Sequence, residues 1–250
     1  MAKIGIIGGS GLDDPKILKN AKEISVETAY GSPSSSLSTG KIGGVEIVIM
    51  ARHGRGHTIP PTQVNYRANI QALKEQGCTH ILATTACGSL RDEIKRGDFV
   101  ILDQFIDFTR FRKISFFEQF EPGDLTKHTP MADPFSEELR NKLIQAGRAL
   151  GLRLHERGTV ITIEGPRFST RAESRMFRLW GADVINMSIA PEVILANEAG
   201  ILYAAIALST DYDCWKTDEP PVEGPDIFRI FTQNVENVKK LLLKTISGID

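Results

Sequence analysis

The sequence is poor in the features that mark secreted, membrane-bound or nucleic-acid-binding proteins. Only 3 of its 250 residues are cysteines, and they have no paired spacing, so neither a disulfide framework nor a metal site is expected. No apolar run approaches the length of a membrane span or of a signal peptide. The net charge of -1 predicts no electrostatic binding of nucleic acid or membrane. We therefore expect a cytoplasmic protein.

Internal repeats and linker-like segments are also absent, so we expect one domain that spans residues 1–250. Short apolar runs alternate with helical patterns, which predicts an α/β fold with a mainly parallel, mixed central sheet flanked by helices. Strands are predicted at 4–7, 45–50, 80–85, 99–102, 158–163, 182–185 and 201–208, and helices from about 63, at 136–150, 171–180, 191–199 and 225–246. Residues 107–130 are Phe-rich and have no clear period, which suggests a functional flap.

Two carboxylates follow the apolar run 201–208. Ligands of open α/β sheets gather beyond the carboxyl ends of the strands, so Asp211 and Asp213 are predicted to reach a binding edge. Their i, i+2 spacing in an extended segment places both on one side. A carboxylate accepts hydrogen bonds and a protonated carboxyl donates one, which suits a nitrogen heterocycle. A solvated acidic turn is the alternative.

Two glycine-rich loops follow the first two predicted strands. The loop 8–11 (GGSG) lacks the spacing of a dinucleotide fingerprint, a Walker loop or a nucleophile elbow, and is either an anion cradle or a plain turn. In 52–57 (RHGRGH), arginine offers a planar fork for phosphate oxygens and the neighbouring imidazole adds a donor. The interleaved glycines make a helical metal pair improbable and favour anion binding over a basic surface turn.

Other polar or aromatic residues end further strands. The segment 84–89 (TTACGS) offers small residues and hydroxyls, and its Cys87 is interpreted as a small, partly buried thiol because the sequence offers it no obvious base. Phe168 is a stacking surface or an ordinary core residue, and Ser169 follows it. Met187 and Ser188 offer a thioether and a hydroxyl. Together these segments describe a pocket with an anion end and an aromatic, carboxylate-lined end.

The chain closely resembles the S-methyl-5′-thioadenosine phosphorylases, within the trimeric purine nucleoside phosphorylase family. The resemblance rests on six ordered motifs that span nearly the whole chain: GGSGLDDP at 8–15, RHGRGHT at 52–58, TTACGSL at 84–90, DQFID at 103–107, IEGPRFSTRAES at 163–174 and DYD at 211–213. It implies a pentosyltransferase of purine and methionine salvage. The reaction converts methylthioadenosine and inorganic phosphate, a co-substrate, to adenine and 5-methylthioribose 1-phosphate. No cofactor or metal is implied.

The resemblance also implies roles for particular residues. Phosphate would be held by Ser10, Arg52, His53, Thr85, the backbone of Ala86, and Ser188. The nucleoside would contact Met187 at the sugar, Phe168 and Ser169 at the purine, Asp211 at N7, Asp213 at the exocyclic amine, and Ile227 and Phe228 at the 5′ group. His128 would come from a neighbouring subunit of a homotrimer, whether or not two trimers pair.

The chemistry of the reaction and the departures of this sequence from the family pattern define the alternative functions. Phosphate is the nucleophile, so the leaving purine needs a proton, which Asp211 supplies only if its pKa is raised. Asp213 favours a 6-amino over a 6-oxo purine. Ser188 replaces the threonine of many relatives. Gly224 and the Pro-rich segment 217–225 differ from relatives in the 5′ region, so we expect a 5′ pocket of different size, which leaves both methylthio and hydroxyl groups as candidates. A phosphorylase for adenosine or 6-oxopurine nucleosides, a nucleosidase that uses water, and a non-catalytic sensor remain alternatives.

Overall fold

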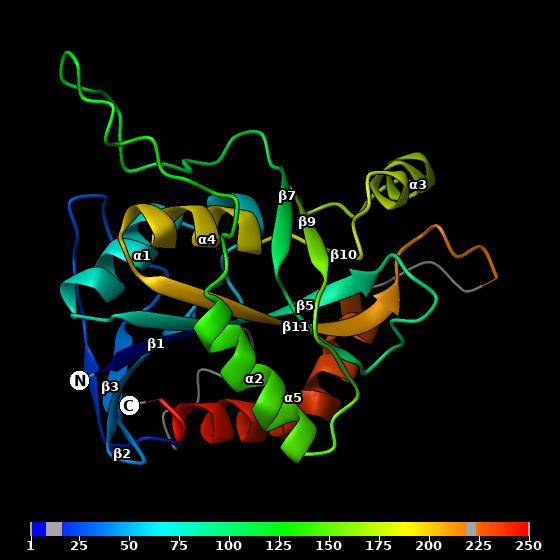
Figure 1. Ribbon diagram of the computed structural model, residues 1–250, viewed down its shortest axis with the longest axis horizontal. Helices are drawn as coiled ribbons and strands as arrows, with labels where there is room; N and C mark the ends of the chain where they lie inside the picture. Colours follow the sequence, from blue (N-terminus) through cyan, green and yellow to red (C-terminus); the bar gives the residue numbers. More distant parts are fainter. Residues whose placement is uncertain (1, 9–16, 219–223, 250) are drawn as a thin grey trace.

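A mixed β-sheet between two layers of helices forms the body of the molecule (Figure 1). The computed structural model describes residues 2–8, 17–218 and 224–249, without the side chains of 224–228. In the described residues the sheet runs β2-β3-β4-β1-β5-β10-β9-β7, and a branch, β11-β6-β8, joins it at β5. The strands are β1 (Lys3–Gly8), β2 (Lys19–Ile24), β3 (Leu37–Ile42), β4 (Val45–Ala51), β5 (His80–Ser89), β6 (Phe99–Ile101), β7 (Gln104–Phe108), β8 (Leu154–His155), β9 (Thr159–Ile163), β10 (Val184–Asn186) and β11 (Leu202–Tyr212).

Four of the five α-helices described divide between the two faces of the sheet. The helices are α1 (Tyr66–Glu75), α2 (Glu137–Ala149), α3 (Arg171–Leu179), α4 (Ile189–Glu198) and α5 (Gly224–Ile246), with a short 3-10 helix at Pro61–Gln63. One core cluster joins α1 and α4 to the sheet through residues such as Ile70 and Val193, and a second joins α2 and α5 to the opposite face (Figure 1). A third, smaller cluster packs Phe177 of α3 against β9 and β10. None of the helices described is both long and apolar enough to cross a membrane.

Local signals explain the helices that the sequence predicted. Ser136 caps α2 by accepting from the Leu139 amide over 3.4 Å, and Gly151, with φ +64°, follows the end of that helix. Thr170 and Glu173 form a reciprocal capping box at α3. Helix α4 begins at Ile189, before the predicted start at Pro191, because proline is tolerated in the first turn of a helix.

The strands differ more from expectation. β5 continues to Ser89 and β11 to Tyr212, whereas both were predicted to end sooner. β2 was missed because its sequence, KNAKEI, is mostly exposed and lacks an apolar alternation. The mixed pairing is confirmed: β1 lies parallel to β4 and β5, while β10 pairs with β5 antiparallel.

The irregular segment 109–135 follows β7 and extends away from the body of the molecule (Figure 1). Its base is anchored by Arg112, whose side chain is 2% exposed. This guanidinium donates to the Met187 carbonyl and to the Glu164 carbonyl, each over 2.6 Å, and to the Tyr66 hydroxyl over 3.0 Å. The distal part is more exposed, with Phe120 at 45% and Leu125 at 75%.

Candidate active site

A cavity of about 470 Å³ lies beyond the carboxyl ends of β4, β9, β10 and β11, against the middle of β5. It brings together ten of the residues that the sequence selected: Arg52, His53, Thr85, Ala86, Phe168, Ser169, Met187, Ser188, Asp211 and Asp213. Segments more than 150 residues apart in the chain thus share one pocket, with an arginine at one end and the aspartate pair at the other.

The cavity meets β5 where that strand changes partners. On one side β5 pairs with β11 along its whole length. On the other side it pairs with β1 over His80–Ala83 and with β10 at Gly88 and Ser89. Residues 84–87 lie between these two partners and line the cavity, so β5 has no paired strand on this side there. Such strand-edge amides are suited to anion binding.

Arg52 fills the inner end of this opening. Its side chain is 2% exposed and contacts the fully buried Glu192 of α4. Nε and Nη2 donate to the two carboxylate oxygens of Glu192, the latter over 2.9 Å, and Nη1 donates to the Thr84 carbonyl over 2.7 Å. Burial alone would lower the pKa of Arg52, but the carboxylate raises it above its ordinary value. A surface turn is therefore the wrong interpretation. These contacts use three of the five N–H donors of a guanidinium and leave two for a ligand.

His53 presents an acceptor to the cavity, not the donor that the sequence suggested. Its Nδ1 lies 3.0 Å from the Ile59 carbonyl oxygen, so Nδ1 carries the proton and Nε2 keeps its lone pair. Burial, and then the charge of Arg52, lower the pKa of His53 to about 4. At neutral pH the ring is uncharged, and it can accept the hydroxyl proton of hydrogen phosphate.

Ser188 occupies the N-cap position of α4 but does not cap the helix with its side chain. Its hydroxyl instead lies 3.3 Å from the Thr85 hydroxyl, across the cavity wall. Helix α4 begins directly after Ser188, and a helix N-terminus favours negative charge. The two hydroxyls and the helix end are therefore arranged to hold an oxyanion.

The aspartate pair lies at the far end, where β11 bulges between Ser209 and Asp211. Asp211 is 7% exposed and Asp213 is 4% exposed, so the solvated-turn alternative is wrong. The Thr210 hydroxyl donates to Asp211 over 2.7 Å. Gly88 makes room for the pair, because a Cβ at this position would lie 2.9 Å from an Asp211 carboxylate oxygen. The Ser169 hydroxyl lies 2.7 and 2.6 Å from the two oxygens of Asp213 and donates to that carboxylate.

An aromatic ring and a thioether complete the walls. Phe168 lines the cavity and is 42% exposed, so ordinary core packing is the wrong interpretation. Met187 packs closely against Gly165, where a Cβ would lie 2.5 Å from the Met187 sulfur. The φ of +64° at Gly165 independently favours glycine. The Met187 backbone is held by the hydrogen bond from Arg112 described above.

Some predicted residues are not brought to this cavity. His128 lies in the projecting segment, with its ring centroid 5.2 Å from that of Phe120. Ser10 lies outside the described residues, as do the side chains of Ile227 and Phe228 and most of the Pro-rich segment. Cys87 is 3% exposed, and burial, followed by the charge of Asp211, raises its pKa well above the ordinary value. Cys87 is thus a thiol, as predicted, that is almost completely buried and not partly buried.

Sequence reasoning missed Glu192, Asn186 and Phe231. Glu192 contacts Arg52, while Asn186 and the helix residue Phe231 line the cavity. A signal for Glu192 was present: it is an acidic residue inside the apolar stretch of α4, IAPEVILA, and a buried carboxylate needs a partner. Its partner, 140 positions away, could not be identified from local pattern.

Comparison with known proteins agrees with this geometry. A sequence model described as the phosphorylase superfamily matches residues 3–247. The chain belongs to the phosphorylase superfamily.

Its relatives narrow this class. The S-methyl-5′-thioadenosine phosphorylase of Danio rerio is 55% identical over 99% of this chain and 89% of its own length. The corresponding Xenopus tropicalis enzyme is 56% identical, with the same coverage. The structure of methylthioadenosine phosphorylase from Schistosoma mansoni with adenine has a TM-score of 0.93 and 45% identity, and covers 100% of this chain and 93% of its own. The structure of a variant of the Schistosoma mansoni adenosine/methylthioadenosine phosphorylase in complex with methylthioadenosine is also similar. Its TM-score is 0.92 and its identity 44%, with the same coverage of both chains.

Proposed function

We propose that this chain catalyses the phosphorolysis of S-methyl-5′-thioadenosine to adenine and 5-methylthioribose 1-phosphate. The observation that carries the proposal is the pocket itself: one cavity joins the Arg52 and Ser188 end to the Phe168 and Asp213 end. The names of the relatives support the same substrate. No cofactor takes part, and inorganic phosphate is the second substrate.

The arrangement of the residues suits this chemistry. Phosphate bound at Arg52, Thr85 and Ser188 attacks the anomeric carbon of the sugar as the bond to the purine nitrogen breaks. The purine leaves with negative charge and takes a proton at N7 from Asp211. Met187 lies against the sugar, and Phe168 stacks on the base. The protein supplies no nucleophile, so its contribution is orientation of phosphate and stabilisation of the departing base.

Adenine selectivity is assigned to Asp213. The Ser169 hydroxyl has one proton and gives it to this carboxylate, so the remaining lone pairs of Asp213 are acceptors. They accept hydrogen bonds from a 6-amino group and repel a 6-oxo group. A buried polar group left without a partner discriminates strongly against the wrong base.

Asp213→Asn is expected to relax this selectivity, because an amide at this position offers both a donor and an acceptor. The ratio of kcat/KM for adenosine to that for inosine should fall by at least about tenfold. Tyr212→Phe, which alters the adjacent half-exposed residue, is the matched control and should preserve the ratio. An unchanged preference for the amino purine in Asp213→Asn would contradict the assignment.

We also propose a cytoplasmic homotrimer in which His128 reaches the 5′ end of the nucleoside in a neighbouring copy. In its own chain His128 lies in the projecting segment 109–135, which carries exposed apolar residues suited to contact with a second copy. Sedimentation of the purified protein would distinguish a single trimer from a pair of trimers.

The test of the function is purine release from methylthioadenosine, adenosine and inosine, each with and without phosphate. Adenine release that requires phosphate and is fastest from methylthioadenosine is the expected result. Release without phosphate would identify a nucleosidase, and hypoxanthine release from inosine as the main activity would overturn the role of Asp213. No release from any substrate would favour a sensor.

A further inference from the structure

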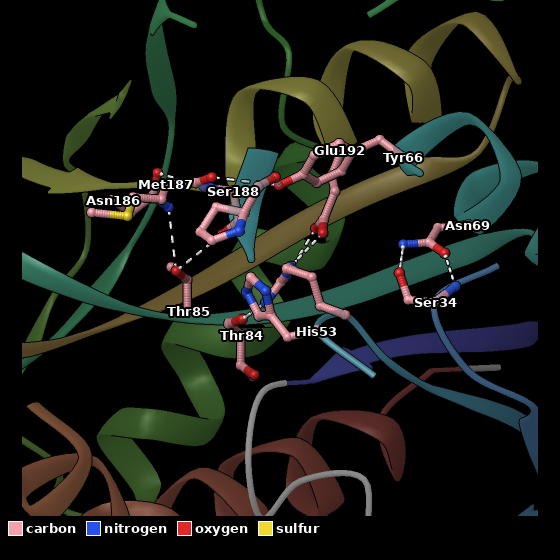
Figure 2. A network of polar contacts seen from close by, with 12 residues as sticks. Ser34, His53, Tyr66, Asn69, Thr84, Thr85, Asn186, Met187, Ser188 and Glu192 are labelled. Carbon is pink, nitrogen blue, oxygen red and sulfur yellow. Dashed lines mark hydrogen bonds and ion pairs between the residues drawn. The ribbon is translucent and has the colours of Figure 1, made fainter. Parts of the chain in front are cut away.

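A series of buried hydrogen bonds connects the Thr85 and Ser188 hydroxyls at the anion end to residues of two neighbouring strands. Its members are Thr162 of β9, Asn186 of β10, Thr85 of β5 and Ser188 (Figure 2 shows the last three). All four are at most 7% exposed, so none of these groups can exchange its protein partner freely for solvent. Thr162 is not part of the cavity wall, whereas the other three are.

The direction of this series is fixed by groups that can only donate. The Ala190 amide donates to the Thr162 hydroxyl oxygen over 3.1 Å. The Thr162 hydroxyl therefore directs its proton to the Asn186 Oδ1, 2.8 Å away. The Ser188 amide also approaches Oδ1, at 3.4 Å. With two donors facing its oxygen, the side chain of Asn186 must turn its Nδ2 the other way.

The fixed amide then sets the direction of the next proton. Asn186 Nδ2 lies 3.3 Å from the Thr85 hydroxyl oxygen and donates to it. The Thr85 proton must therefore point away from Asn186, and it lies toward the Ala86 carbonyl oxygen at 2.9 Å. The same proton can turn to an anion in the cavity. A reversed amide would make Thr85 donate to Asn186 and turn its lone pairs toward the anion.

We propose that Asn186 is a positioning residue that, held by Thr162, directs the Thr85 hydroxyl proton toward phosphate. The inference deepens the proposed function and rests on it for the identity of the anion. The orientation of the Thr85 hydroxyl matters because a hydroxyl binds an oxyanion when it directs its proton toward it and repels the oxyanion when it directs its lone pairs toward it. Preorganised donors of this kind avoid reorganisation when the ligand binds.

The test is a double-mutant cycle read by calorimetric titration with inorganic phosphate in the absence of nucleoside. Asn186→Ala and Thr85→Val are each expected to weaken phosphate binding by about tenfold, the effect of one lost hydrogen bond to an anion. The double variant should bind no more weakly than Thr85→Val alone, because Asn186 acts through Thr85. The KM for the nucleoside should stay within about twofold in each variant.

Thr162→Val provides a second variant that leaves the cavity wall unchanged. It is expected to weaken phosphate binding several-fold, and to add nothing to Thr85→Val. Asn197→Ala is the matched control, because its amide bonds backbone carbonyls of Pro134 and Val193 away from the cavity, and it should leave phosphate affinity unchanged.

Additive losses in the Asn186 and Thr85 double variant, about a hundredfold in total, would overturn the inference, because they would mean that Asn186 contacts phosphate independently. Unchanged phosphate affinity in Asn186→Ala would overturn it as well. The proposed function is judged separately, by adenine release from the unmodified protein. Phosphate binding with the expected coupling but without adenine release would refute the function and leave the positioning role intact.

Discussion

Asp211→Asn is expected to lower the turnover number for adenine release by about 10² to 10⁴-fold and to leave phosphate affinity nearly unchanged. The asparagine amide keeps the size of the side chain and can still donate a hydrogen bond to purine N7. It cannot transfer a proton to the departing base. Asp211 lies at the purine end of the cavity, whereas Arg52 and Ser188 form the anion end. The substitution should therefore change the turnover number without a comparable change in phosphate affinity.

Asp92→Asn is the matched control for this prediction. Asp92 is a surface carboxylate, with a 67% exposed side chain, paired with Lys216 over 2.8 Å near the same end of β11. It should retain full turnover. Comparable losses of turnover and phosphate binding in Asp211→Asn, by steady-state kinetics and phosphate titration, would refute the role as proton donor.

Glu192→Ala is expected to destabilise the fold and to abolish high-affinity phosphate binding. Removal of one partner of a buried ion pair costs about 3–5 kcal/mol, because the other charge stays buried without compensation. For a chain of this size, that corresponds to a Tm lower by about 6–20 °C. The Arg52 fork also loses two of the three contacts that orient it, so added phosphate, which is expected to raise the Tm of the unmodified protein, should no longer do so in this variant.

A surface control and a conservative substitution at Glu192 test whether these effects come from the buried ion pair. Glu236→Ala removes an exposed pair with Lys239 and should change the Tm by no more than about 2 °C. Glu192→Gln preserves the volume and one carbonyl acceptor, so it should recover part of the stability but less of the phosphate response. Stability and phosphate response equal to those of the unmodified protein in Glu192→Ala would show that the pair supports neither.

Local signals were sufficient for the elements whose start, end and face are encoded nearby. Ser136 and Gly151 bracket α2, and the apolar run 201–208 predicts the core of β11. The placement of Arg52, Phe168 and Asp211 around one cavity followed from their positions after predicted strands. The resemblance to a known family assigned them roles that their local sequence could not supply.

Long-range pairing limited the rest. The contact between Arg52 and Glu192 joins residues 140 positions apart, and the hydrogen bond between Asn186 and Thr85 joins residues 101 positions apart. β11 continues past its bulge to Tyr212 because it stays paired with β5. The apolar run 201–208 alone carries no sign of this pairing and therefore predicted too short a strand. The tautomer of His53 likewise depends on a carbonyl that only the folded loop brings within reach.

The opening of β5 between β1 and β10 bears on aggregation. A strand edge with free amides and carbonyls is a template for pairing with another chain, and proteins usually cover or charge such edges. Here the accessible stretch, residues 84–87, spans roughly 13 Å at the usual rise per residue and is closed at both ends by neighbouring strands. A tetrahedral anion fits against a stretch of this length, whereas a foreign peptide would have to displace β1 or β10. This opening of β5 thus presents a strand edge to a small ligand over a stretch too short for amyloid-like growth.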